Sequence, residues 1–209
     1  MNILVIAPHP DDEAIGCGGT LRLHADRGER ITAAFLTSGE LGLEHVPPSE
    51  AHRIREGEAE EAAAVLGIAR LEFMRFPDWF TSEHQPAIVE QLSTILRAEI
   101  PGRIYLPHPD DNHPDHRAVF ASACRAMRAS GVTAEILAYE VWTPLARAEE
   151  VEDITAVVRE KLRAIRCYRS QLASFRYDRA ARGLATYRGA LHGGCGFAEA
   201  FEPLLPEYE

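Results

Sequence analysis

Short apolar runs that alternate with longer amphipathic stretches constrain the fold of this chain most strongly. The first run, Asn2 to Ala7, has no alternating polar side chains, which is typical of a strand buried on both faces of a parallel sheet. Further strands are predicted at residues 30–36, 71–76, 103–107 and 135–141, and helices at 13–27, 50–66, 87–98 and 114–128. This alternation predicts an α/β fold: a Rossmann-like, open, mostly parallel sheet with helices on both faces.

The alternation weakens after Val141. One long helical pattern spans residues 154–172, and a Gly-rich segment follows at 189–196. No Pro- or Ser-rich linker marks a second domain. We therefore expect a single domain, 1–209, with a core at 1–141 and a C-terminal extension at 142–209.

Composition excludes several classes of protein. The chain has 32 acidic residues against 22 Lys and Arg, a formal charge of -10, which disfavours nucleic acid as a partner because phosphate contacts need a basic surface. Its four cysteines are scattered and predict neither a disulfide framework nor a thiolate zinc site. No apolar run approaches the roughly 18 residues of a membrane span. We expect a cytoplasmic protein that acts on a small molecule, without a membrane partner.

Two polar clusters follow predicted strands in the same way. The first, His9 to Glu13 ("HPDDE"), comes after the first strand, and the second, His108 to His116 ("HPDDNHPDH"), comes after the strand at 103–107. In an open parallel sheet, ligands bind outside the carboxyl ends of the strands, where the strand order switches. The two clusters are therefore expected at one sheet edge, facing each other.

Histidines and aspartates without thiolates are the ligands of a catalytic rather than a structural zinc. His9 and Asp12 are three residues apart around a turn, whereas the adjacent Asp11 projects differently. One carboxylate can then bind the metal while its neighbour holds the metal's water. In the second cluster His108, His113 and His116 all remain candidate ligands. Three N/O ligands with an open position favour hydrolysis.

The order of these motifs, "HPDDE" and then "HPDH" at 113–116, resembles the LmbE-like or PIG-L family of zinc-dependent N-acetylglucosaminyl deacetylases. Four weaker segments extend the resemblance over nearly the whole chain: "LTSGELG" (36–42), "REGEAEEAAAVLG" (55–67), "KLRAIRCYRSQL" (161–172) and "FAEAFE" (197–202).

The resemblance implies one Zn²⁺ per chain, in a position that another divalent metal can also occupy. It implies metal ligands at His9, Asp12 and His116, a general base at Asp11, a protonated His113 beside the scissile carbonyl with Asp115 next to it, and substrate contacts from Glu40 and Arg55. The implied reaction removes an N-acetyl group from a small GlcNAc conjugate, such as the GlcNAc-malate precursor of bacillithiol. Similar proteins often form homo-oligomers.

Some positions depart from the family pattern. Asp111 stands where some members carry a tyrosine, and Phe197 replaces the usual tyrosine before "AEAF". Tyr187 and His192 are the candidates to supply the missing donor. Substrate choice is expected to depend on loops at 41–51, 78–85 and 191–196.

Other readings of the same residues stay open. The first acidic cluster also suits the start of a solvated helix, and Arg55 also suits an exposed helix position paired with Glu58. His108 is the main rival of His116 as a ligand. The alternative functions are a Rossmann-like, metal-containing sugar- or nucleotide-binding module without hydrolase activity and a metal-dependent phosphoester hydrolase. The phosphoester hydrolase is disfavoured because neither motif has a loop beside it that would bind a phosphate.

Overall fold

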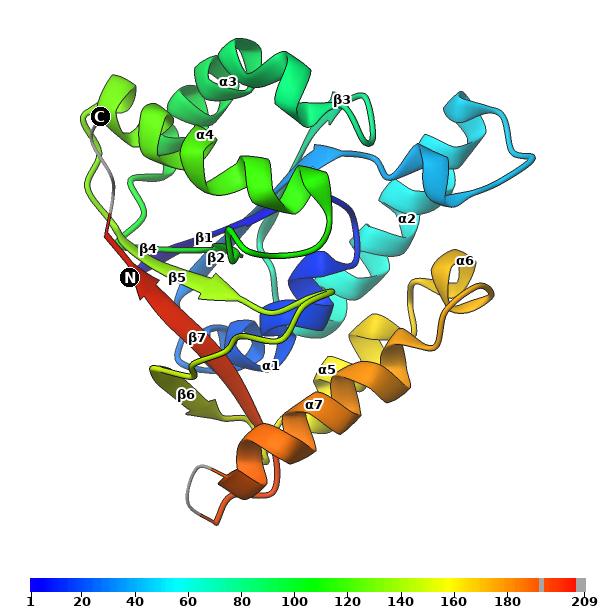
Figure 1. Ribbon diagram of the computed structural model, residues 1–209, viewed down its shortest axis with the longest axis vertical. Helices are drawn as coiled ribbons and strands as arrows, with labels where there is room; N and C mark the ends of the chain where they lie inside the picture. Colours follow the sequence, from blue (N-terminus) through cyan, green and yellow to red (C-terminus); the bar gives the residue numbers. More distant parts are fainter. Residues whose placement is uncertain (192–193, 206–209) are drawn as a thin grey trace.

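The computed structural model describes residues 1–191 and 194–205, which contain one seven-stranded sheet in the order β3-β2-β1-β4-β5-β7-β6 (Figure 1). The strands are β1 (Asn2–Ala7), β2 (Arg30–Thr37), β3 (Arg70–Phe76), β4 (Arg103–Pro107), β5 (Glu135–Tyr139), β6 (Glu150–Asp153) and β7 (Ala198–Leu204). The helices are α1 (Asp12–Asp26), α2 (Pro48–Leu66), α3 (Gln85–Glu99), α4 (Pro114–Ser130), α5 (Val158–Ile165), α6 (Arg169–Leu172) and α7 (Tyr177–Leu191), with short 3-10 helices η1 (Glu40–Gly42) and η2 (Thr81–His84).

The first five strands are parallel, as the sequence predicts, and the strand order reverses between β1 and β4. Leu4 of β1 pairs with Ile104 of β4, so the two strands run side by side toward the same edge. The loops after them therefore face each other at the topological switch point, where ligands bind in open α/β sheets.

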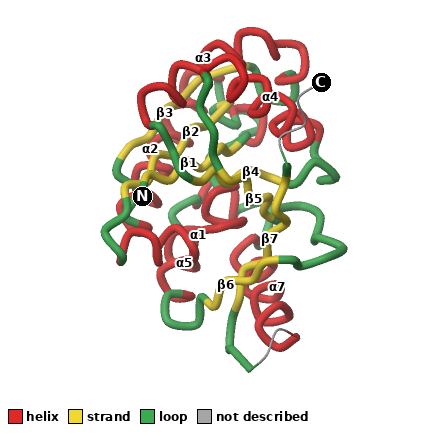
Figure 2. Tube along the Cα trace, turned by 90° about the vertical axis from the view of Figure 1, so that its left-hand side faces the viewer, coloured by secondary structure: helices red, strands yellow, loops and turns green. Residues whose placement is uncertain are grey.

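Helices cover both faces of the sheet (Figures 1 and 2). Along β1 the side chains alternate between two cores, because successive residues of a strand point to opposite faces. Ile3 and Val5 belong to the core under α1, α2, α5 and α7, and Leu4 and Ile6 belong to the core under α3 and α4. This explains the unbroken apolar run. Among the described helices, none is long and apolar enough to cross a membrane.

The C-terminal extension differs from the expectation. The predicted helix at 154–172 is two helices, α5 and α6, because the chain turns at Tyr168 and buries its ring in the core. The helix α6 begins where Ser170 donates its backbone N–H to Glu58 of α2 (2.9 Å). Helix α7 and strands β6 and β7 were not predicted from the sequence. The last two strands join the sheet antiparallel, with β7 between β5 and β6.

A side chain of β7 also compensates for an irregular turn in α1. That helix has non-helical backbone angles at Cys17 (φ −134°, ψ 18°), so its second half begins with unpaired N–H groups. Glu199 of β7 accepts hydrogen bonds from the backbone N–H groups of Gly19 (2.8 Å) and Thr20 (2.7 Å), and from the Lys161 ammonium (2.5 Å). The extension thereby holds the helix that begins at Asp12.

Candidate active site

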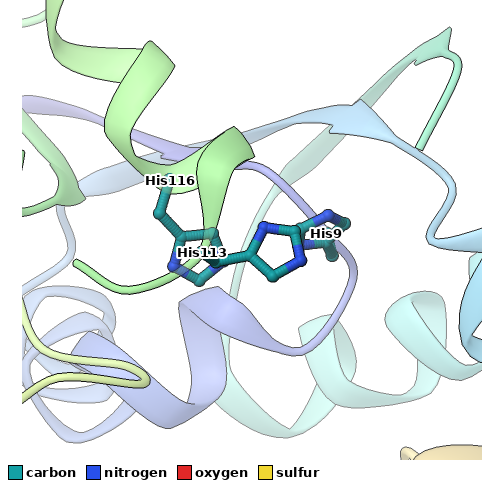
Figure 3. A group of neighbouring side chains, drawn as sticks. All are labelled: His9, His113 and His116. Carbon is teal, nitrogen blue, oxygen red and sulfur yellow. The ribbon is translucent and has the colours of Figure 1, made fainter. Parts of the chain in front are cut away.

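The two polar clusters meet at the carboxyl ends of β1 and β4. Figure 3 shows three imidazoles gathered there: His9 comes from the segment after β1, and His113 and His116 come from the start of α4. The His113 ring centre lies 4.7 Å from that of His9 and 4.9 Å from that of His116. Pro114 at the first helical position and His113 at the N-cap begin α4 at this point, as the sequence predicts.

One carboxylate oxygen joins the predicted ligand residues. Oδ2 of Asp12 lies 3.1 Å from Nδ1 of His9 and 3.3 Å from Nε2 of His116. All three side chains are buried. The structure therefore brings together His9, Asp12 and His116, which the family resemblance singles out.

The second nitrogen of each of these two imidazoles faces another carboxylate. Nε2 of His9 lies 3.0 Å from Oδ1 of Asp78 and 3.2 Å from Oδ2 of Asp115, and Nδ1 of His116 lies 3.2 Å from Oδ1 of Asp111. Carboxylates in this outer position orient metal-binding imidazoles. Sequence reasoning missed this role for Asp78 and Asp111. Asp111 lies within the second motif, but Asp78 follows β3 without any motif.

The cluster fits a small divalent cation. Ligand atoms at the roughly 2.0–2.2 Å typical of zinc are about 3.3 Å apart in a tetrahedron, close to the 3.1 and 3.3 Å between Asp12 and the two imidazoles. The imidazoles of His9, His113 and His116 also place one nitrogen each within 4.8 Å of the others, so His113 stays a rival ligand. Both nitrogens of His116 are buried without a hydrogen-bond partner, since neither nearby carboxylate oxygen lies in a suitable direction. A metal ion would satisfy Nε2 directly.

The carboxylates also create a strong preference for positive charge. Burial alone would lower the pKa of His116, but the charge of Asp12 and the close carboxylate of Asp111 raise it to about 9. Burial opposes charge on His9 too, yet contacts with Asp115, Asp12 and Asp78 raise its pKa well above the usual value. The site is therefore built around a cation.

The other two histidines of the second motif have different partners. Nε2 of His108 lies 2.7 Å from the carbonyl oxygen of Thr143, so this nitrogen is hydrogen-bonded away from the histidine cluster. Nδ1 of His113 accepts the backbone N–H of Asp115 (3.3 Å), so a neutral ring carries its proton on Nε2. Burial and the charges of His9 and His116 lower the pKa of His113 to about 4. This arrangement favours a neutral His113, whereas the family resemblance implies a protonated ring.

Asp115 is also placed differently from the expectation. Its carboxylate accepts hydrogen bonds from the backbone N–H groups of Trp79 (2.8 Å) and Thr81 (3.2 Å) and from the Thr81 hydroxyl (2.7 Å), and it faces His9. Only its backbone N–H contacts the His113 imidazole. Asp115 therefore ties the loop before η2 to the histidine cluster.

Asp11 stands beside the cluster in a strained backbone conformation, with φ 127°. Its N–H donates to Oε2 of Glu13 (3.1 Å), whose other oxygen accepts the hydroxyl of Tyr168 (2.5 Å). Burial raises the pKa of Asp11 to about 6, although the charge of Arg55 opposes this shift. A carboxylate with such a pKa is suited to moving protons near neutral pH.

Arg55 does not have the exposure that substrate contact requires. Its guanidinium group is 2% exposed and donates to the carbonyl oxygen of Pro10 (2.5 Å) and to Oδ2 of Asp11 (3.4 Å). It pairs with Asp11, and not with Glu58, because α2 packs beneath the loop after β1. Arg55 therefore supports Asp11 from behind, which corrects the expectation of direct substrate binding.

Glu40 lies in η1 and links two loops at the same edge. Its Oε1 accepts the N–H of Asp78 (3.0 Å), and Asp78 in turn accepts the N–H of Leu41 (3.1 Å). Oε2 of Glu40 is buried without a hydrogen-bond partner and lies 3.5 Å from Nε2 of His52. Glu40 therefore connects η1 to the loop after β3, and its predicted substrate contact stays a prediction.

The candidate replacement donors lie in the C-terminal extension. Tyr187 is exposed, and Arg188 lies 5.6 Å from its ring centre; the contacts within residues 1–191 and 194–205 do not connect it to the histidine cluster. His192, with part of the loop 191–196, lies outside the described residues.

Comparison with known proteins agrees with this geometry. Residues 4–127 match the family model PIG-L, described as GlcNAc-PI de-N-acetylase. The chain is 30% identical over 194 residues to a probable N-acetyl-alpha-D-glucosaminyl L-malate deacetylase 2 of Bacillus cereus, covering 87% of this chain and 88% of the relative. It is 29% identical to diacetylchitobiose deacetylase of Thermococcus kodakarensis, covering 91% and 79% of the two chains.

The fold agrees as well. The solved structure of N,N'-diacetylchitobiose deacetylase from Pyrococcus horikoshii, in complex with an inhibitor, superposes with a TM-score of 0.86 at 27% identity, covering 98% of this chain and 84% of that one. Together with the motifs at the ends of β1 and β4, these matches show that the chain belongs to the PIG-L family of de-N-acetylases.

Proposed function

We propose that this protein is a zinc-dependent deacetylase that removes the N-acetyl group of a small GlcNAc conjugate and releases acetate. The observation that carries the proposal is the meeting of His9 and His116 at one oxygen of Asp12, with the carboxylate of Asp11 beside them. Two relatives are named as deacetylases of N-acetyl-alpha-D-glucosaminyl L-malate and of diacetylchitobiose. These names support a GlcNAc conjugate as the substrate. The four free cysteines suit a reducing cytoplasm.

His9, Asp12 and His116 would hold one metal ion per chain. Two imidazoles and one carboxylate with an open position are a ligand set of catalytic zinc, and the outer carboxylates Asp78, Asp111 and Asp115 would orient the imidazoles. Bound zinc supplies a Lewis acid for the acetyl carbonyl and lowers the pKa of a coordinated water.

Asp11 is then the general base. It takes a proton from the attacking water as the new C–O bond forms at the acetyl carbon, and it returns that proton to the amine nitrogen as the C–N bond breaks. Glu13 fixes the backbone of Asp11, and the charge of Arg55 keeps its carboxylate available. The products are acetate and a free amino sugar.

His113 stabilises the oxyanion. Because Nδ1 accepts the N–H of Asp115, the neutral ring presents Nε2–H as the donor. A metal ion at the neighbouring His9 and His116 would disfavour an imidazolium further, so a neutral donor is consistent with the charge of the loaded site.

Acetate release tests the proposal. Metal-stripped and zinc-restored protein is assayed with GlcNAc, GlcNAc-malate, GlcNAc-inositol and N,N'-diacetylchitobiose. We expect acetate from at least one conjugate, only after zinc is restored. Metal-dependent sugar binding without acetate release would instead indicate a binding module. Phosphate release from sugar phosphates would indicate a phosphoester hydrolase.

A further inference from the structure

Three aromatic side chains of the C-terminal half form a surface patch. Trp142 follows β5, Phe175 precedes α7, and Tyr177 begins α7. Each ring contacts the other two: the ring centres of Trp142 lie 5.9 Å from those of both Phe175 and Tyr177, which are 5.7 Å apart. Trp142 is 47% exposed and Phe175 is 53% exposed. Exposed apolar patches of this kind on a soluble protein mark binding sites.

This aromatic patch continues the candidate active site. The ring centre of Trp142 lies 6.5 Å from that of His113. Tyr177 extends the patch from Trp142, since their ring centres lie 5.9 Å apart. A ligand with its amide at His113 therefore has the patch next to it.

A second exposed indole contacts the same histidine. The ring centre of Trp79 lies 4.6 Å from that of His113, and Trp79 is 54% exposed. Its φ of 71° is unfavourable for a residue with a side chain, and its N–H is held by Asp115. Strain maintained at an exposed ring beside an active site indicates a binding role.

The backbones that carry both indoles are fixed by the carboxylates that orient the candidate ligands. Asp111 faces His116 and accepts the N–H of Trp142 (3.0 Å), while Asp115 faces His9 and accepts the N–H of Trp79 (2.8 Å). The indoles are therefore positioned relative to the histidines, as a specificity subsite requires.

The charged groups around the patch favour a neutral occupant. Arg176, between Phe175 and Tyr177 in the chain, pairs with Asp178 (3.1 Å). Arg117 of α4 donates to the carbonyl oxygens of Asp111 (3.1 Å) and Asn112 (2.8 Å). Lys161, in the cavity behind Trp142, pairs with Glu199. These cations are engaged within the protein, whereas the site itself is rich in carboxylates, so an anionic group would be repelled.

We propose that Trp142, Phe175 and Tyr177 form a subsite for a second, uncharged pyranose ring attached to the N-acetylglucosamine whose amide lies at His113. The C–H groups on one face of a pyranose carry partial positive charge and pack on the negative faces of aromatic rings. This inference rests on the proposed deacetylase function and narrows its substrate to neutral disaccharides of GlcNAc. A malate aglycone, with two carboxylates, fits the patch poorly.

Kinetics with Trp142→Ala test the subsite. The zinc-loaded wild type is expected to have a higher kcat/KM for N,N'-diacetylchitobiose than for GlcNAc or GlcNAc-malate. Trp142→Ala should lower the value for the disaccharide about tenfold more than it lowers the value for GlcNAc. Trp142→Phe, which keeps a ring, should recover part of the loss. Phe175→Ala replaces Trp142→Ala if circular dichroism shows that the latter is unfolded.

Two results would overturn the subsite: an equal loss for GlcNAc and the disaccharide, or a wild type that prefers GlcNAc-malate. Calorimetric binding to an Asp11→Asn background separates this proposal from the proposed function. The disaccharide should bind more tightly than GlcNAc, and Trp142→Ala should abolish the difference. Equal affinities would refute the subsite whether or not the protein turns over sugars, whereas a failure of acetate release alone would refute only the deacetylase function.

Discussion

The parallel half of the molecule and its C-terminal extension contribute different things to one site. The segments after β1 and β4, up to the first turns of α1 and α4, supply the charged groups at the centre: His9, Asp12 and His116, with Asp11 beside them. The extension supplies groups that hold or surround this centre. Tyr168 binds Glu13 behind Asp11, and residues of the patch lie next to His113.

This difference has a physical basis. The parallel strands end at one edge, so short motifs after them converge without help from distant residues. The extension acts through contacts that span much of the chain, such as Glu199 with Gly19 and Thr20, 180 and 179 residues apart. Substitutions in the parallel half are therefore expected to abolish metal binding or turnover. Substitutions in the extension are expected to lower the stability of the fold, the placement of Asp11 or the substrate specificity.

The largest effect is expected from a ligand position. His116→Ala removes the nitrogen that lies 3.3 Å from Asp12, so zinc affinity should fall more than about 100-fold, since even outer partners of metal ligands cost 10–100-fold. Turnover should fall with it. Metal content after dialysis and acetate release measure both effects.

His108→Ala is the matched control from the same motif. His108 is directed to the carbonyl of Thr143, so this variant should keep its zinc. The opposite pattern, with zinc lost from His108→Ala and kept by His116→Ala, would reverse the ligand assignment.

In the extension, Glu199→Ala should lower stability and leave the chemistry of the folded protein intact. The change removes the acceptor of the N–H groups of Gly19 and Thr20, and it leaves the buried ammonium of Lys161 with the carbonyl oxygen of Ile15 but without its carboxylate partner. We expect a loss of about 3 kcal/mol, or roughly 8 °C in Tm. Thermal unfolding checks this, with Glu202→Ala on the same strand as the control. Equal Tm values for the two variants would show that Glu199 does not stabilise α1.

A smaller effect is expected from Tyr168→Phe, which removes one hydroxyl and keeps the ring. Oε1 of Glu13 then loses its hydrogen-bond donor, so the Glu13 carboxylate is less firmly placed. The hydrogen bond that Oε2 accepts from the backbone N–H of Asp11 should weaken as a result. We expect kcat to fall about tenfold with unchanged KM and zinc content, as for other outer partners of catalytic groups. An unchanged kcat would show that Tyr168 does not support Asp11 in catalysis. A change in KM alone would indicate that Tyr168 contacts the substrate.

Much of the parallel half could be predicted from sequence because its signals are local. The bounds predicted for β1 and β4 agree with the structure, and Gly67 ends α2 in the left-handed conformation that glycine adopts readily. The extension could not be predicted as well. Its helical period continues through Tyr168, but burial of that ring against Glu13 breaks the helix.

The site residues follow the same division. The motif spacing indicated a His/Asp metal site but left His108, His113 and His116 open, and the family resemblance singled out His116, which meets His9 at Asp12. The partners of Arg55 and Asp115 depend on packing between distant elements: Arg55 faces Asp11 because α2 lies under the first loop, and Asp115 faces His9 and Trp79 because the loop after β3 closes over α4. No local pattern encodes these contacts.

The central claim is that the adjacent carboxylates Asp11 and Asp12 have different tasks. The most direct test is the zinc content of Asp11→Asn, measured together with its acetate release. Asparagine has nearly the same shape as the aspartate that adopts this backbone conformation, so the fold should survive. We predict one zinc per chain, as in the wild type, and turnover reduced about a thousandfold because the base is lost. Normal turnover, or loss of zinc from this variant, would contradict the account.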